Sequence, residues 1–89
     1  MAMVSFTPHL KRHVECDSIE VAGENIAQVL RGVFSSYDQL RGYVIDDQGR
    51  LRKHVVVFIN GEPVTDRIHL TDAVDADAEV YVMQALSGG

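Results

Sequence analysis

Gly88 and Gly89, the last two residues of the sequence, are the first candidates for chemistry. Glycine has no Cβ, so a diglycine segment can enter a narrow channel in another protein. The terminal carboxylate that we expect on Gly89 is ionised at neutral pH, and it is a poor acyl donor until it is converted into an anhydride or a thioester. These residues therefore favour a protein that serves as the substrate of another enzyme. A frayed chain end without a function is the alternative.

Other reactive side chains have less suggestive spacing. The possible metal ligands are His9, His13, Cys16, His54 and His69. Only His9, His13 and Cys16 lie close together in the sequence, scattered around a predicted turn, while His54 and His69 are distant, so we expect no metal. Cys16 stands between Glu15 and Asp17, which disfavour the thiolate that a catalytic cysteine needs. Because no catalytic residues are indicated, we expect a protein that is not an enzyme.

Two groups of charged residues are interpreted as surface. The acidic group consists of Asp72, Asp75, Asp77 and Glu79. It lacks the ordered spacing of a calcium loop, so we interpret it as a solvated loop that helps to attract a basic partner. The basic group consists of Arg41, Arg50, Arg52 and Lys53, and we interpret it as part of the solvated surface.

Size and composition limit the possible functions. The chain has 89 residues, 46% of them hydrophobic and 24% charged, which predicts one globular domain with a modest core and no roomy active site. The formal net charge of −5 disfavours nucleic acids and anionic membranes as partners. The single cysteine excludes an internal disulfide, and no apolar stretch has the length of a membrane span. We therefore expect a soluble, cytoplasmic protein.

The hydrophobic pattern predicts two strands and a helix in the first half of the chain. Residues 3–7 alternate as a strand, and residues 13–21 are interpreted as its kinked hairpin partner. A helix is predicted after Asn25, which caps it, while Gln28 reaches back to complete a capping box. Gly32 weakens this helix. Its apolar stripe consists of Ile26, Val29, Leu30, Val33 and Phe34.

The second half is predicted to add three strands. Residues 37–52 are expected to form a loop with one helical turn. Residues 54–59 form an apolar strand, and Asn60-Gly61 is typical of a tight hairpin turn before a short returning segment. The core anchors expected in the crossing segment that follows are Ile68, Leu70 and Val74. Residues 80–83 are apolar on both faces, which favours a central strand that leads into the diglycine.

Strand alternation assigns the apolar residues of the last strands to two faces. The residues expected to face the helix are Val55, Val57, Ile59, Val80 and Val82. The residues expected on the opposite face are Val56, Phe58, Tyr81, Met83 and Ala85. An exposed apolar patch of this kind usually marks a partner surface. We therefore expect a partner to bind here and to contact Leu86 and Ser87 beside it.

The order of these elements resembles the β-grasp, or ubiquitin-like, fold. Within that fold, residues 46–52, 58–62 and 85–89 resemble the ThiS/MoaD-like sulfur-carrier family, which includes the small subunit of molybdopterin synthase and the thiamine-pathway sulfur carrier. The resemblance implies an α+β domain over residues 1–86, with a mixed sheet of four to five strands and one main helix across one face. It also implies a flexible tail over residues 87–89.

The resemblance further implies a mechanism. An adenylating enzyme of the ubiquitin-activating type joins the Gly89 carboxylate to AMP from ATP, while Gly88 provides a slender approach. Sulfide or persulfide then displaces AMP, and the resulting thiocarboxylate donates sulfur to an acceptor synthase in thiamine, molybdenum cofactor or other biosynthesis. The carrier itself binds no permanent cofactor, because its partner uses the ATP.

Two alternatives stay open at this point. One is a ubiquitin-like modifier that is joined to lysines of other proteins through Gly89. The other is a plain β-grasp interaction module. Gln84 stands where many members of the family have proline, so the sequence leaves the biosynthetic pathway undecided.

Overall fold

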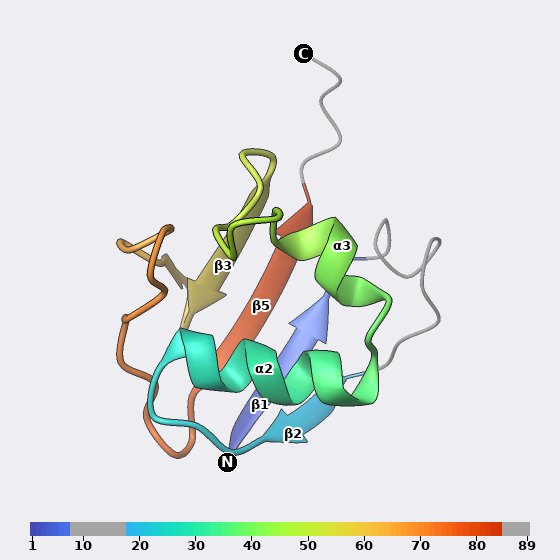
Figure 1. Cartoon of the computed structure of the whole chain (residues 1–89). Helices are drawn as coiled ribbons and strands as arrows, with labels where there is room; N and C mark the ends of the chain where they lie inside the picture. Colours follow the sequence, from blue (N-terminus) through green and yellow to red (C-terminus); the bar gives the residue numbers. More distant parts are fainter. Residues whose placement is uncertain (8–17, 85–89) are drawn as a thin grey trace.

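The computed structural model describes residues 1–7 and 18–84 of the chain (Figure 1). In these ranges it contains a five-stranded mixed sheet with the strand order β2-β1-β5-β3-β4. The strands are β1 (Ala2–Phe6), β2 (Ile19–Val21), β3 (Val55–Ile59), β4 (Glu62–Pro63) and β5 (Glu79–Gln84). The helices are α2 (Ile26–Ser36) and the short α3 (Leu40–Val44). The predicted α+β architecture, with one main helix across one face of the sheet, is confirmed (Figure 1).

The helix α2 forms because its capping residue marks a helix start directly before its apolar stripe begins. The Asn25 side chain accepts a hydrogen bond from the Gln28 N–H at 2.9 Å, as predicted. Gln28 reaches back one residue further than predicted, because its Oε1 accepts from the Glu24 N–H at 2.9 Å. The next donors of the first turn, the Ile26 and Ala27 N–H groups, bond to backbone carbonyls of the segment before β5. The helix start is therefore fixed to that segment.

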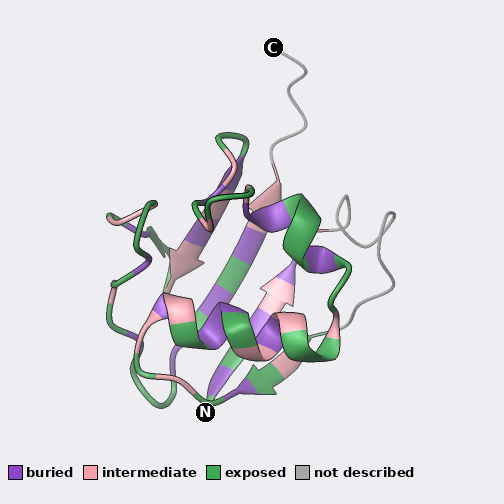
Figure 2. Cartoon of the chain, viewed as in Figure 1, coloured by how far each residue is buried: buried purple, intermediate pink, exposed green. Residues whose placement is uncertain are grey.

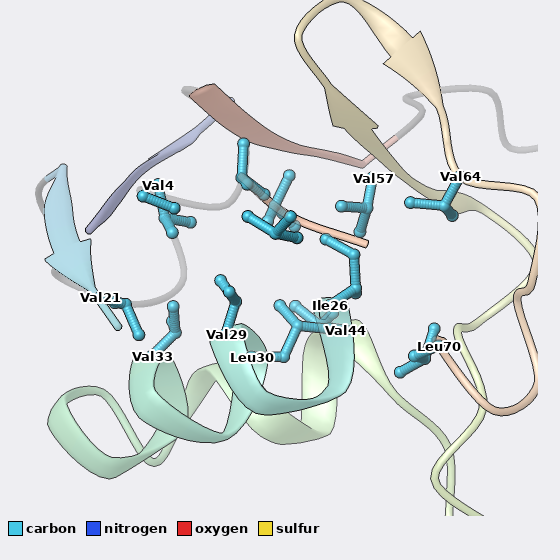
Figure 3. Packing of buried hydrophobic residues seen from close by; sticks show 14 of the residues in the cluster. Val4, Val21, Ile26, Val29, Leu30, Val33, Val44, Val57, Val64 and Leu70 are labelled. Atoms are coloured by element: carbon cyan, nitrogen blue, oxygen red, sulfur yellow. The ribbon is translucent and has the colours of Figure 1, made fainter. Parts of the chain in front are cut away.

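The apolar stripe of α2 packs onto the sheet. Its members Ile26, Val29, Leu30 and Val33 are at most 2% exposed, and Phe34 is half-buried against the core. Figure 3 shows Ile26, Val29, Leu30 and Val33 pointing from the helix toward the sheet, from which Val4 and Val57 point toward the helix. Burial of each large side chain contributes about 1.5 to 3 kcal/mol, so this layer is a substantial contribution to the stability of the fold. Figure 2 shows the same pattern as a buried interior between helix and sheet.

Gly32 of α2 lies close to Val21 of β2. A Cβ built on Gly32 would collide with Val21 Cγ1. The glycine that was predicted only to weaken the helix therefore also permits its close approach to the sheet.

β5 occupies the centre of the sheet. It runs parallel to β1, with Met3 opposite Glu79, and antiparallel to β3, with Val55 opposite Gln84. Val80 and Val82 face the helix and are almost fully buried, which confirms the predicted central position. The strand is thus paired with β1 up to Val82 and with β3 up to its last residue, Gln84.

The hairpin between β3 and β4 confirms the Asn60-Gly61 prediction. Both residues have positive φ angles, 51° and 86°, as a tight turn of this kind requires. The Asn60 side chain also accepts a hydrogen bond from the Glu79 N–H at 3.0 Å. This turn therefore positions the start of β5 as well as the end of β3.

Three boundaries or anchors differ from the predictions. The first strand is Ala2–Phe6 and not 3–7, and only Ile19–Val21 of the predicted 13–21 partner is a described strand, since residues 8–17 lie outside the described ranges. Leu70 and Val74 are buried anchors, but Ile68 is 57% exposed. The reason is a tight turn in which Asp66 accepts hydrogen bonds from the Ile68 and His69 N–H groups.

Candidate functional site

The strand that leads to the predicted reactive end is rigidly placed. Gln84, the last described residue before 85–89, lies opposite Val55 of β3. On the other side its N–H donates to Thr7 Oγ1 at 3.4 Å. Proline, which is frequent here in the resembling family, could not make this bond because it has no N–H.

The predicted reactive and tail residues are the five consecutive residues 85–89. Gly88 and Gly89, together with the predicted partner contacts Ala85, Leu86 and Ser87, lie outside the described residues. The candidate site therefore consists, in the described part of the chain, of the strand end at Gln84 and the sheet face beside it.

The sheet face opposite α2 carries the other predicted contacts. Val56, Phe58 and Met83 are half-buried, and Tyr81 is 38% exposed. Their positions follow from the register, in which Phe58 is paired with Tyr81 and Val56 with Met83. No helix of the described ranges crosses this face (Figure 1).

Met3 belongs to the same face but is absent from the predicted contacts. It is 40% exposed and lies next to Glu79 in β5 and Glu20 in β2. Its alternation with the buried Val4 was the signal that could have identified it. We call the five residues Met3, Val56, Phe58, Tyr81 and Met83 the open face.

The open face is hollowed next to its most exposed side chain. A shallow pocket of about 380 Å³ is lined by Met3, Phe58 and Tyr81, among others. The acidic residue Glu79 also lines it. An apolar hollow with an acidic rim suits a protein partner better than a small charged substrate.

The carboxylates with perturbed pKa values serve local structure. The Thr71 hydroxyl, at 2.6 Å, and the His69 N–H lower the pKa of Asp66 to about 2. Backbone N–H groups of Thr65 and Asp66 likewise lower the pKa of Asp72. Both carboxylates hold the segment between β4 and β5, and neither lies on the open face.

The search for metal and membrane features gives two findings. Within residues 1–7 and 18–84, no group of three or more histidine, cysteine, aspartate or glutamate side chains is arranged to hold a metal ion. None of the helices in these ranges combines the length and the apolar character that a membrane crossing requires.

The predicted basic group is divided between two surfaces. Arg50, Arg52 and Lys53 line one pocket together with Arg67, which comes from the segment after β4. Arg41 lines a separate groove between α2 and α3. Sequence proximity alone could not reveal that Arg67 completes the cluster.

Comparison with known proteins identifies both a family and a set of similar structures. The model of the ThiS family matches residues 10–89 of this chain. A search of curated proteins gives no match.

Three solved structures illustrate the likeness of the fold. A chain of the Amycolatopsis orientalis BexX/CysO complex has a TM-score of 0.85 and 21% identity, with all of both chains covered. SAMP1 from Haloferax volcanii has a TM-score of 0.80 and 23% identity over 99% of this chain and 98% of its own. The HVO 2177 protein of Haloferax volcanii has a TM-score of 0.72 and 28% identity over 99% of this chain and 85% of its own. These likenesses confirm the predicted β-grasp, ubiquitin-like fold.

Proposed function

We propose that this chain, which belongs to the ThiS family, is a sulfur carrier that is activated at Gly89. The observation that carries the proposal is the extent of the family match, which runs through Gly88 and Gly89 to position 89. We propose that Gly89 carries the terminal carboxylate, since a carboxylate that follows a diglycine suits acyl activation by another enzyme.

The proposed chemistry takes place in two steps. A carboxylate oxygen of Gly89 attacks the α-phosphorus of ATP, and pyrophosphate leaves, so an acyl adenylate forms. Hydrosulfide, or a persulfide of a donor protein, then attacks the acyl carbon, and AMP leaves with the electrons of the broken C–O bond. With hydrosulfide the product is the thiocarboxylate directly. With a persulfide the product is an acyl disulfide, and a thiol of the donor protein then attacks the donor's sulfur of the S–S bond, so that the thiocarboxylate leaves and the donor keeps a disulfide. This product hands its sulfur to an acceptor synthase, and the chain itself supplies no catalytic group.

The sheet supports this role by placing the tail. Because β5 is paired with β1 up to Val82 and with β3 up to Gln84, the segment that follows starts from a fixed position. A fixed origin reduces the orientational entropy that is lost when the tail enters a partner. We therefore propose that the activating enzyme binds at the end of the sheet where β5 ends.

The open face is the proposed docking surface for that enzyme. Phe58 and Tyr81 offer aromatic area of the kind that dominates binding energy at interfaces. Val56 and Met83 extend the surface toward the end of β5, and we propose that Ala85, Leu86 and Ser87 continue it. We propose a cytoplasmic location, where ATP-using enzymes operate.

A protein modifier is the second candidate function. It is favoured by the likeness to the structure named small archaeal modifier protein 1 of Haloferax volcanii, which has a TM-score of 0.77 and 20% identity. Such a modifier would use the same acyl adenylate, but a lysine amine would attack in place of hydrosulfide. The two functions therefore differ only in the nucleophile.

Mass spectrometry of the intact chain tests the first function. The protein is incubated with ATP, sulfide and a cognate activating enzyme, and we expect the mass to rise by the difference between sulfur and oxygen at Gly89. A variant without Gly89 is the control and should show no change. If pyrophosphate is released but the mass stays constant, the sulfur-carrier proposal is wrong. Adducts with lysines of other proteins, lost with Gly89, would support the modifier instead.

A further inference from the structure

A concentration of positive charge lies beside the end of β5. A pocket of about 620 Å³ is lined by Arg50, Arg52, Lys53, His54, Arg67 and Ile68. We call these six residues the basic pocket. It holds half of the eight lysines and arginines of a chain whose net charge is −5.

Most of this charge is not neutralised within the described ranges. Arg50 forms an ion pair with Asp46 at 3.3 Å, and Asp46 also lines the pocket. Arg52, Lys53 and Arg67 have no ion-pair partner in residues 1–7 and 18–84. Four cations and one carboxylate leave the pocket with three positive charges when His54 is neutral.

The two inner guanidinium groups are held in place by backbone carbonyls. Arg52 Nε donates to the Gly42 carbonyl at 2.7 Å, and Arg67 Nη2 donates to the Arg52 carbonyl at 2.7 Å. Each of these bonds uses one of the five N–H donors of a guanidinium. The other donors stay available to a ligand without the entropy cost of ordering a free arginine.

The pocket is adjacent to the proposed path of the tail. Lys53 and His54 directly precede Val55, which is paired with Gln84 at the end of β5. The acidic residues Asp75, Asp77 and Glu79 stand at the other end of the same strand. The chain is therefore acidic overall but basic at the end of the sheet that faces the activating enzyme.

We propose that the basic pocket binds an acidic segment of the activating enzyme. Guanidinium groups bind carboxylates in a bidentate manner, which suits aspartate or glutamate side chains of a partner. Ile68, which is 57% exposed in the pocket, offers a contact for an apolar side chain between those carboxylates. A peptide segment supplies both groups, whereas a free phosphate supplies only charge. This inference rests on the proposed function for the identity of the partner.

The binding site is tested without ATP, enzyme or Gly89 chemistry. A short synthetic peptide of alternating glutamate and leucine is titrated into the isotopically labelled full chain, and NMR records the backbone amides. We expect saturable shifts at residues 50–54 and 67–68. Lys53→Glu should weaken the binding about tenfold, since it reverses one charge without removing a recorded hydrogen bond. Arg31→Glu, the same charge reversal on the exposed surface of α2, is the matched control and should leave the affinity unchanged.

Three outcomes would overturn the inference. The first is that the peptide gives no saturable shifts. The second is that Lys53→Glu and Arg31→Glu lose binding equally. The third is that inorganic phosphate reproduces the shifts and blocks the binding of the peptide. The activating enzyme gives a second readout: Lys53→Glu should raise the KM for the carrier and leave kcat unchanged. A carrier that is never adenylated would refute the proposed function alone, because the peptide titration does not depend on adenylation.

Discussion

Phe58 and Tyr81 are direct partners across β3 and β5, on the sheet face that α2 does not cover. Two aromatic side chains on neighbouring strands give this face its largest apolar area. Cross-strand pairs of this kind contribute about 0.2 to 1 kcal/mol to a sheet, whereas aromatic residues at the centre of an interface contribute about 2 kcal/mol or more to binding. The pair therefore matters more for a partner than for the fold.

Tyr81→Ser should accordingly separate binding from stability. We expect at least about tenfold weaker binding of the activating enzyme, with a loss of unfolding free energy below about 1 kcal/mol. Calorimetric titration and urea unfolding measure the two quantities. Val82→Ala, on the next residue but the buried face, is the matched control and should lower stability instead. Unchanged affinity of Tyr81→Ser would show that the partner binds elsewhere.

The two helical glycines should respond in opposite ways to the same substitution. Gly32→Ala introduces a Cβ into the contact with Val21, and overpacking of this kind costs about 1 to 3 kcal/mol. Gly42→Ala in α3 meets no atom within 4 Å, so the gain in helix propensity should stabilise the chain by about 0.5 to 1 kcal/mol. Thermal unfolding measures both changes. If Gly42→Ala lowers the stability, the open space beside Gly42 is contradicted. When Val21→Ala is combined with Gly32→Ala, it should recover part of the stability that Gly32→Ala loses.

Removal of the helix cap should cost stability without changing any core contact. Asn25→Ala deletes the acceptor of the Gln28 N–H, which costs about 1 kcal/mol. For a domain of this size the melting temperature should fall by about 4 to 8 °C. Asn25→Asp keeps an acceptor and should melt within the error of the parent chain. Equal melting of the alanine and aspartate variants would mean that the cap has no energetic role.

Asp66 should make the stability depend on pH in the acid range. The folded-state pKa is lowered from 3.8 to about 2, chiefly by the Thr71 hydroxyl. Between these values the unfolded chain binds more protons, so the stabilisation is complete above the unfolded pKa and is lost as the pH falls toward about 2.

Urea unfolding at a series of pH values tests this expectation. Asp66→Asn should be less stable than the parent at neutral pH, and its midpoint should fall less steeply below about pH 4. Asp75→Asn, whose side chain accepts no hydrogen bond in the described ranges, is the control and should keep the parental slope. Parallel slopes for all three proteins would exclude Asp66 as the source.

The parts of the fold that were predictable from sequence are the local ones. Asn25 and the apolar stripe of α2 lie within a few turns of each other, so the local pattern was sufficient to predict the helix. Asn60-Gly61 determines its own turn, so these two residue types were sufficient to predict the hairpin. The apolar character of β5 on both faces also indicated its central position.

The parts that were not predictable depend on contacts between distant segments. Gly32 had a role that became visible only with Val21 opposite it, and Arg67 joined the basic pocket from another segment. Ile68 has the residue type of a core anchor, but the hydrogen bonds of Asp66 turn the chain so that Ile68 is exposed. Register and turn geometry, which periodicity does not encode, account for each of these differences.

The parallel pairing of β1 with β5 also governs how the chain reaches this structure. Met3 and Glu79 are neighbours in the sheet, so their contact closes a loop that spans most of the sequence, and the entropy cost of that closure precedes any gain from it. The helix and the hairpin form through local contacts, so their formation does not require the closure of this long loop. We therefore expect β5 to complete the sheet in the last, slow step. Chains that are truncated before β5 would not assemble the open face and would not compete with intact chains for the proposed activating enzyme.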